Sequence, residues 1–120
     1  IKGTVLNNCN SQARYTPVTG NDFDKRNKNW PDLFRTEADA RKNQGFWRYE
    51  FVKHGTCCSD LFNEEKYFDL AVGLKDRFDL LKIFRNKGII PGSNYTVNKI
   101  EKTIRTVTGV VANLSCTGAM

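Results

Sequence analysis

The sequence predicts a single α+β domain in which helices dominate. The chain has 120 residues, which is the length of one domain and enough to bury a real core. Capping residues followed by apolar side chains at helical spacing recur along the chain and predict several helices. The segments Gly3–Leu6 and Gly109–Cys116 have the character of short strands. No repeat, linker or low-complexity segment interrupts the chain, so the prediction is one domain over residues 1–120.

The first half of the chain combines loop signals with two predicted helices. Residues 1–20 are rich in Asn, Thr, Ser and Gly, and residues 21–28 are polar and charged. A helix is predicted to begin at Pro31, because proline is tolerated at the first helical position, and to continue through the charged residues 33–43. Gly45 separates it from a second helix with the sequence FWRYEFVKHG.

Three more helices are predicted in the second half of the chain. Asn63 is an N-cap signature before the first of them. The apolar positions of this helix are Tyr67, Leu70, Ala71 and Leu74. The next predicted helix, Asp79–Arg85, ends at Gly88, and Thr96 caps the last one. The apolar positions of the last helix are Val97, Ile100, Ile104 and Val107.

The composition is that of an ordinary globular protein with a basic excess. Hydrophobic residues make up 39% and charged residues 27% of the chain. The formal net charge of +6 and the pI near 9.3 favour a polyanionic partner, with nucleic acid ahead of a membrane surface. No apolar run is long enough to span a bilayer, so no membrane role is predicted.

The segment Phe46–Cys58 contains the only histidine, His54. Read as a helix, it places Glu50, Lys53 and His54 on one face, because residues three and four apart are neighbours. A carboxylate, an ammonium and an imidazole at one spot suit acid–base catalysis near neutral pH. The same pattern also occurs in solvated ion pairs and structural charge networks. The opposite face carries three apolar anchors for a core, Phe46, Trp47 and Phe51.

The cysteines and two glycosylation motifs favour an oxidising, secreted setting. The cysteines are Cys9, Cys57, Cys58 and Cys116. They form no CxxC pair and only one histidine is present, so no metal site is predicted. Cys57 and Cys58 are adjacent and poorly placed to pair with each other, so each needs a distant partner. The candidate glycosylation sites are Asn94 and Asn113.

The string FWRYEFVKHGTCC closely resembles the second active-site motif of the T2 family of ribonucleases. The resemblance is closest to the self-incompatibility ribonucleases (S-RNases) of the nightshade type. Within the string, KHGTCC is the specific element. Supporting matches are Trp30–Leu33, Tyr67–Leu70, Leu74–Asp76, Pro91–Ser93 followed by Tyr95-Thr96, and Asn113-Leu114 before Cys116. The resemblance implies a T2-ribonuclease-type fold, with several helices packed on an antiparallel sheet.

The resemblance also implies that the chain is truncated at both ends. The first active-site motif of the family, histidine-glycine-leucine-tryptophan-proline, would lie upstream of Ile1, and further strands and cysteines would follow Cys116. We therefore expect an internal fragment of a longer secreted enzyme, with an incomplete sheet and no activity of its own. The alternative is a naturally short protein.

The activity implied by the resemblance is cleavage of single-stranded RNA without a metal or other cofactor. The ribose 2′-hydroxyl attacks the neighbouring phosphorus and yields a 2′,3′-cyclic phosphate, which is then hydrolysed to a 3′-phosphate. His54 matches one of two catalytic imidazoles and is assigned the base role. Lys53 would stabilise charge on the phosphorane oxygens, and Glu50 would orient or tune the site. Phe46 matches a position that stacks on a base, although a core role beside Trp47 is an equal alternative.

The remaining expectations from the resemblance concern other positions. Many T2 enzymes have a further, phosphate-binding histidine where this chain has Tyr49, so cleavage is expected to be slower. The resemblance favours a disulfide from Cys9 to the 57–58 pair, with Cys57 preferred. Two variable stretches, which carry allelic identity in S-RNases, should fall near residues 12–28 and 34–45.

Three functions are compatible with these residues. The first is a secreted, monomeric S-RNase that degrades RNA in pollen tubes and is recognised by pollen F-box proteins. The second is a non-S T2 ribonuclease used in phosphate salvage or defence; the basic pI favours the first, because non-S relatives are commonly acidic. The third is a catalytically dead recognition protein, against which Glu50, Lys53 and His54 argue.

Overall fold

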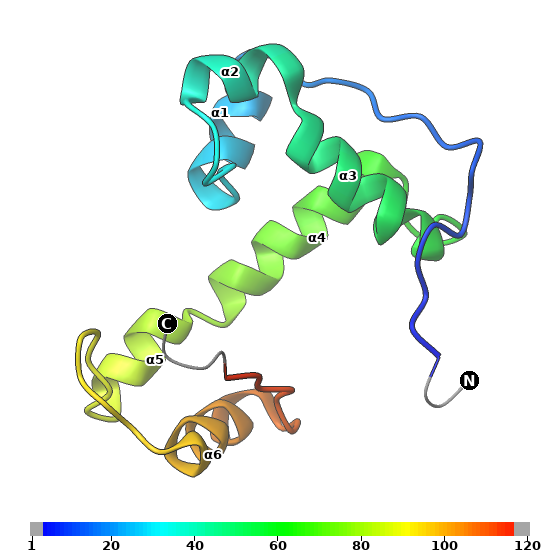
Figure 1. The fold of residues 1–120 in the computed structure, drawn as a ribbon. Helices are drawn as coiled ribbons and strands as arrows, with labels where there is room; N and C mark the ends of the chain where they lie inside the picture. Colours follow the sequence, from blue (N-terminus) through cyan, green and yellow to red (C-terminus); the bar gives the residue numbers. More distant parts are fainter. Residues whose placement is uncertain (1–3, 117–120) are drawn as a thin grey trace. The chain divides into compact units, whose positions relative to one another are not determined.

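The computed structural model describes residues 4–116, and all regular structure among them is helical (Figure 1). The chain forms two compact units, residues 1–73 and residues 74–120. No described helix is long and apolar enough to cross a membrane.

The first unit contains three helices, a short 3₁₀ turn and the start of a fourth helix, which continues into the second unit. They are α1 (Gly20–Asn29), α2 (Glu37–Asn43), α3 (Gly45–Lys53), the 3₁₀ turn η1 (Gly55–Cys58) and α4 (Glu64–Arg77). Thr36 is the N-cap of α2. Its hydroxyl accepts a hydrogen bond from the Asp39 N–H and donates one to the Asp39 carboxylate. At the start of α4, the Asn63 side chain accepts from the Lys66 N–H at 2.9 Å, as the sequence predicted.

Gln44 joins α2 to α3 and ties both to the N-terminal loop. Its backbone is left-handed, with φ of 49°, which ends one helix and lets the next begin in a new direction. Its buried amide accepts from the Tyr15 hydroxyl at 2.7 Å and from the Val18 N–H at 3.0 Å. The same amide donates to the Val18 carbonyl at 2.7 Å. A polar side chain is stable in this core because its amide is hydrogen-bonded on both sides.

The core of the first unit is largely aromatic. Its buried members are Tyr15, Phe23, Ala40, Trp47, Phe51 and Phe68. The rings of Phe23 and Trp47 meet edge to face with centroids 5.2 Å apart, and those of Trp30 and Phe68 do so at 5.6 Å. Trp47 and Phe51 therefore anchor α3 in the core, as predicted from its apolar face.

The second unit contains the end of α4 and the helices α5 (Leu80–Asn86) and α6 (Val97–Thr108), which pack against each other. Asp79 caps α5 through the Lys82 N–H at 3.0 Å, and Thr96 caps α6 through the Lys99 N–H at 3.2 Å. Gly109 ends α6 with φ of 75°, a backbone conformation that favours glycine. The Thr96 cap was predicted from the sequence, whereas Gly109 had been assigned to a strand.

Several predicted elements differ from the structure. The helix expected from Pro31 begins only at Glu37, because residues 31–36 form a turn in which the Asp32 carboxylate accepts from the Phe34 N–H. Helix α1 lies over residues that were described only as polar and charged. Its contribution to the core is confined to Phe23 and the buried Arg26, so its hydrophobic pattern is weak.

The two predicted strands are also absent from the described residues. Thr4–Leu6 and Gly109–Cys116 have no ladder partner there, and Gly3 lies outside the described residues. A strand needs a neighbouring strand to satisfy its backbone groups, so β-prone sequence alone does not form one. The apolar positions expected on α4 were partly wrong, because Phe68 is buried whereas Leu70 and Leu74 remain 42% and 46% exposed.

Candidate active site

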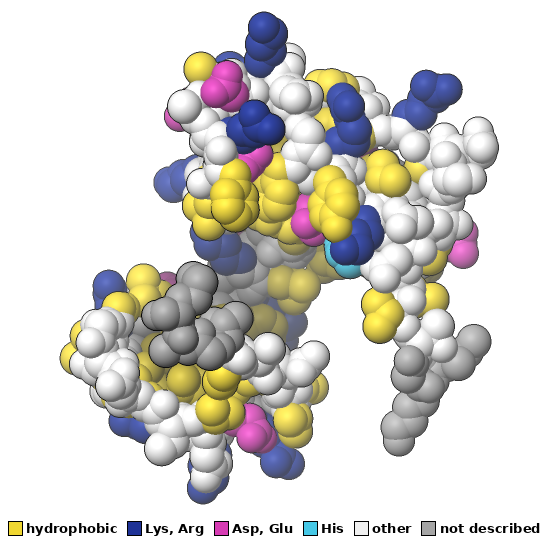
Figure 2. Space-filling model, in the orientation of Figure 1, with side chains coloured by type: hydrophobic (Ala, Val, Ile, Leu, Met, Phe, Trp, Pro, Cys, Tyr) yellow, Lys and Arg dark blue, Asp and Glu magenta, His cyan; other side chains and the backbone are white. Residues whose placement is uncertain are grey.

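His54 ends α3 and brings the predicted site residues together. Its backbone N–H donates to the Glu50 carbonyl at 2.9 Å, which places the two residues one turn apart. Glu50 and Lys53 are half-buried, whereas His54 is exposed at the surface, where it is the cyan side chain in Figure 2. The imidazole at the helix end is thus accessible, and Glu50 and Lys53 precede it within one turn.

Lys53 is held by Tyr49, one turn earlier on α3. Its ammonium donates to the Tyr49 hydroxyl at 2.6 Å and lies 5.0 Å from the centre of the ring. The hydrogen bond to Tyr49, with a smaller contribution from the Glu50 carboxylate, raises the pKa of Lys53. Lys53 therefore remains a cation at neutral pH. Tyr49 was predicted only as the replacement of a phosphate-binding histidine, although its i, i+4 spacing from Lys53 indicated this contact.

The segment that follows His54 is fixed by a disulfide and by close packing. Cys9 and Cys57 form a disulfide with Cα atoms 4.9 Å apart, which is the pairing that the resemblance favoured. Next to it, the Asn8 N–H donates to the Lys53 carbonyl at 2.7 Å. These links attach the N-terminal loop to the end of α3, so the backbone around His54 has little freedom.

Gly55 must lack a side chain for the turn after His54 to form. A Cβ atom at this position would lie 2.5 Å from the Phe51 ring and 3.2 Å from the Tyr67 ring. Because glycine has no side chain, the backbone between α3 and η1 can pack directly against these two rings. The glycine of the KHG string therefore has a packing role that places the histidine at the helix end.

Phe46 contributes to the core, and its stacking on a base stays a prediction. Its ring meets the Trp30 ring edge to face at 6.2 Å, so it contributes to the core. It also lines a hollow of about 610 Å³ together with Phe34, Gln44, Gly45 and part of α2. Phe34 is 96% exposed, which is unusual for an aromatic side chain.

The other predicted positions are the two glycosylation motifs and the two remaining cysteines. Asn94 and Asn113 are exposed, and both belong to the second unit. Cys58 and Cys116 are free thiols, and the Cys58 sulfur lies 3.1 Å from the Gly55 carbonyl. Among residues 4–116, no three His, Cys, Asp or Glu side chains gather as a metal-binding group.

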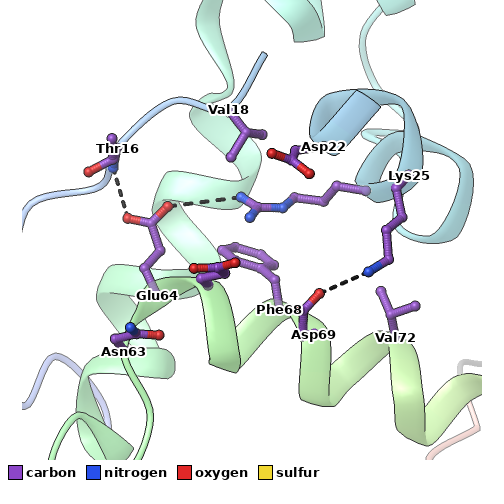
Figure 3. A pocket seen from close by; sticks show the side chains of 11 residues that line it. Thr16, Val18, Asp22, Lys25, Asn63, Glu64, Phe68, Asp69 and Val72 are labelled. Atoms are coloured by element: carbon purple, nitrogen blue, oxygen red, sulfur yellow. Dashed lines mark hydrogen bonds and ion pairs between the residues drawn. The ribbon is translucent and has the colours of Figure 1, made fainter. Parts of the chain in front are cut away.

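A second hollow of the first unit surrounds a buried arginine that sequence analysis did not identify (Figure 3). The Arg26 guanidinium is stacked 3.7 Å from the centre of the Phe68 ring and donates to the Tyr15 hydroxyl at 3.1 Å. It also lies 4.0 Å from the Glu64 carboxylate, which accepts from the Thr16 N–H at 2.8 Å. This network connects α1, α4 and the N-terminal loop.

Glu64 makes the stability of the first unit dependent on pH. Burial raises the pKa of its carboxyl above 4.5, although Thr16 and Arg26 oppose the shift. The folded state therefore binds the proton more tightly than the unfolded state. The contribution of Glu64 to stability is greatest below pH 4.5 and decreases as the pH rises through its folded pKa.

We expect Glu64→Gln to remove this pH dependence. Relative to the variant, the wild type should lose free energy of unfolding as the pH rises from about 4.5, at no more than about 1.4 kcal/mol per pH unit. Urea unfolding at closely spaced pH values measures the difference. Glu65→Gln is the control, because Glu65 is the next residue in the chain and its carboxylate is exposed. The expectation would be contradicted if the free energy of unfolding of the wild type, minus that of the variant, stayed constant or rose with pH.

The family of the chain follows from comparison with known proteins. The model of the ribonuclease T2 family matches residues 2–119. Ribonuclease S-6 of Nicotiana alata is 50% identical over 119 residues, which cover 95% of this chain and 54% of that protein. Ribonuclease 3 of Arabidopsis thaliana is 32% identical over 111 residues, covering 91% of this chain and 49% of that protein. The chain thus spans about half the length of these relatives.

Solved structures bear out the fold class. The crystal structure of the self-incompatibility-associated SF11-RNase of Nicotiana alata matches with a TM-score of 0.93 and 36% identity, over 98% of this chain and 60% of that one. RNase NT in complex with 5′-AMP matches with a TM-score of 0.74 and 27% identity, over 92% of this chain and 54% of that one. The predicted T2-type fold is confirmed, and the chain belongs to the ribonuclease T2 family.

Proposed function

We propose that this chain carries one half of the catalytic centre of an endoribonuclease that cleaves single-stranded RNA. The observation that supports this most directly is the exposed imidazole of His54 at the end of α3, next to an ammonium group that stays charged. In the proposed reaction the ribose 2′-hydroxyl attacks the adjacent phosphorus, the 5′-oxygen leaves, and a 2′,3′-cyclic phosphate forms. Hydrolysis then gives a 3′-phosphate.

Each residue of the site has a proposed role in this reaction. The His54 imidazole removes the proton of the 2′-hydroxyl, because an accessible base must reach that proton directly. The Lys53 ammonium stabilises the negative charge that grows on the phosphorane oxygens. Glu50 lies one turn before His54 and orients or tunes the imidazole. Tyr49 fixes the position of the Lys53 ammonium through its 2.6 Å hydrogen bond.

The leaving 5′-oxygen needs a proton from a second group. The chain contains a single histidine and spans about half the length of its relatives. We propose that the acid is an imidazole in a part of the protein outside residues 1–120, and that this chain alone does not cleave RNA. Phe46 is proposed to stack on a base of the substrate at the hollow that it lines.

The proposed biological role is that of the stylar determinant of gametophytic self-incompatibility. Identity is 50% to Ribonuclease S-6 of Nicotiana alata and 32% to Ribonuclease 3 of Arabidopsis thaliana, which favours this role over a non-S ribonuclease. In this role the protein is a secreted monomer, glycosylated at Asn94 and Asn113, and it is recognised by pollen F-box proteins. The disulfide between Cys9 and Cys57 suits a secreted protein.

The experiment that tests the activity is RNA cleavage by the whole protein in the presence of EDTA. We expect cleavage of single-stranded RNA with 2′,3′-cyclic phosphate ends, followed by slower appearance of 3′-phosphates. The protein should be shown to be folded by circular dichroism in the same buffer. No cleavage by folded protein would overturn the proposal in favour of a recognition protein without catalysis. Cleavage that leaves 5′-phosphates would overturn the mechanism.

A further inference from the structure

The excess positive charge of the chain lies in the unit that does not contain His54. Residues 74–120 have eight Lys and Arg against three Asp and Glu, whereas residues 1–73 have eleven against ten. The cations of the first unit are partly neutralised, because Lys25, Arg26 and Arg41 form ion pairs with carboxylates. Dark blue side chains project from the surface over α5 and α6 (Figure 2). The Lys and Arg side chains of the second unit are exposed to solvent.

Three of these cations line one hollow. Lys99 and Lys102 lie one turn apart on the same face of α6, and Lys87 comes from the end of α5. Together with Asn98 and three threonines they line a hollow of about 410 Å³ that contains no carboxylate. None of the three lysines forms an ion pair with a described residue.

The lining is suited to phosphate groups rather than to an apolar ligand. It contains no aliphatic or aromatic residue. The Thr103 and Thr106 hydroxyls donate to the carbonyls of Lys99 and Lys102 at 2.9 Å and 2.7 Å, so their protons are used within α6. The Thr96 hydroxyl accepts from the Lys99 N–H and keeps its proton. The ammonium groups, the Thr96 hydroxyl and the Asn98 amide are therefore the donors that remain for a ligand. Lysine ammonium groups bind phosphates as point charges, without the geometric demands of a bidentate contact.

We propose that this hollow binds the phosphodiester backbone of single-stranded RNA, through phosphates that are not themselves attacked. The proposal rests on the proposed function, and it adds Lys87, Lys99 and Lys102 as a backbone-binding site. An acidic protein is the weaker candidate, because the centre of a protein–protein interface is normally apolar or aromatic and this hollow is neither. Backbone binding requires only cations that displace the counterions of the phosphates.

The test compares two variants of the whole protein that have the same net charge. The site variant is K87Q/K99Q/K102Q, and the control is K28Q/K66Q/K82Q, which removes three exposed lysines outside the hollow. The ligand is a 20-nucleotide 2′-O-methyl RNA, which has no 2′-hydroxyl and cannot be cleaved by the proposed reaction. Binding is measured at a series of salt concentrations. Circular dichroism confirms that both variants are folded.

We expect the site variant to bind more weakly and with less dependence on salt. Loss of three phosphate contacts lowers the slope of log K against log salt by about 2 for a single strand. Raising salt from about 50 to about 200 mM should therefore weaken wild-type binding about 20-fold more than variant binding. The control should keep a slope close to that of the wild type.

Two results would overturn the proposal. In the first, both variants lose the same affinity and slope, which indicates a general charge effect without a site. In the second, RNA binding is unchanged while binding of poly-glutamate is lost only in the site variant, which assigns the hollow to an acidic protein. Because the RNA analogue is not cleaved, either result can be read whether or not the protein is a ribonuclease.

Discussion

Replacing His54 with alanine is expected to lower RNA cleavage by about 10²–10⁴-fold, the usual contribution of one general acid–base group. The imidazole is exposed and lies outside the aromatic core, so its removal should leave the fold intact. The measurement is the rate of cleavage of single-stranded RNA by the whole protein, together with its thermal unfolding midpoint. The midpoint should stay within a few degrees of the wild type.

A matched control separates loss of chemistry from local disturbance. Ser59→Ala changes an exposed residue just beyond η1 and should retain both activity and stability. Full activity of the His54→Ala protein would remove His54 from the mechanism. Equal loss of activity in the Ser59→Ala protein would show that the segment is sensitive to any change, and the catalytic assignment of His54 would then be unsupported.

Removal of the disulfide should have the largest effect on stability. The Cys9–Cys57 bond closes a loop with a sequence separation of 48 residues. In the chain-entropy model, loss of such a cross-link destabilises the folded state by about 4 kcal/mol. This is a large part of the total stability of a typical domain, which is about 5–15 kcal/mol. Chemical unfolding of the Cys9→Ser/Cys57→Ser double variant measures the loss.

An exposed serine beyond η1 supplies the control for this prediction. Ser59→Ala should leave the unfolding midpoint unchanged, because Ser59 is exposed and outside the disulfide. The double variant should also lose RNA cleavage at denaturant concentrations where it is still folded. Without the disulfide, the N-terminal loop is held less firmly, and with it the Asn8–Lys53 hydrogen bond that positions the end of α3. An unfolding free energy equal to that of the wild type would mean that the packing around Gly55 alone fixes this segment.

The helices of the second unit show what local sequence can determine. Thr96 makes the capping bond that the sequence predicted, and Asp79, predicted as the first residue of its helix, makes the same kind of bond. These signals depend on neighbours within a few residues, so no knowledge of the rest of the fold was needed. Helix α1 lacks such a signal, since Thr19 makes no side-chain capping bond, and it was not predicted.

Predictions that depended on distant partners were less successful. The segments at both ends have β-prone sequences, but no strand pairs with them among the described residues. On α4, periodicity could not distinguish the exposed Leu70 and Leu74 from Phe68, because burial depends on which core the helix meets. The burial of Arg26 could not be predicted for the same reason, because it depends on Phe68 and Tyr15 from elsewhere in the chain.

The backbone placement of the three candidate residues was predictable because they lie within one helical turn. Spacing alone placed Glu50, Lys53 and His54 together, and the structure positions them at the end of α3. The support of that site comes from further away. The Asn8 hydrogen bond and the contact between Phe51 and the Gly55 position depend on tertiary packing and could not be derived from the spacing.

The most direct test of the account is to observe His54 while a product analogue binds. The ring signals of His54 in the whole protein can be assigned by comparison with a His54→Gln variant, and a nucleoside 3′-phosphate is then added. The account predicts that these signals shift on binding, that Lys53→Ala weakens the response, and that the nucleoside without phosphate has no effect. Binding of the nucleotide that leaves the His54 signals unmoved would contradict the placement of the catalytic centre at the end of α3.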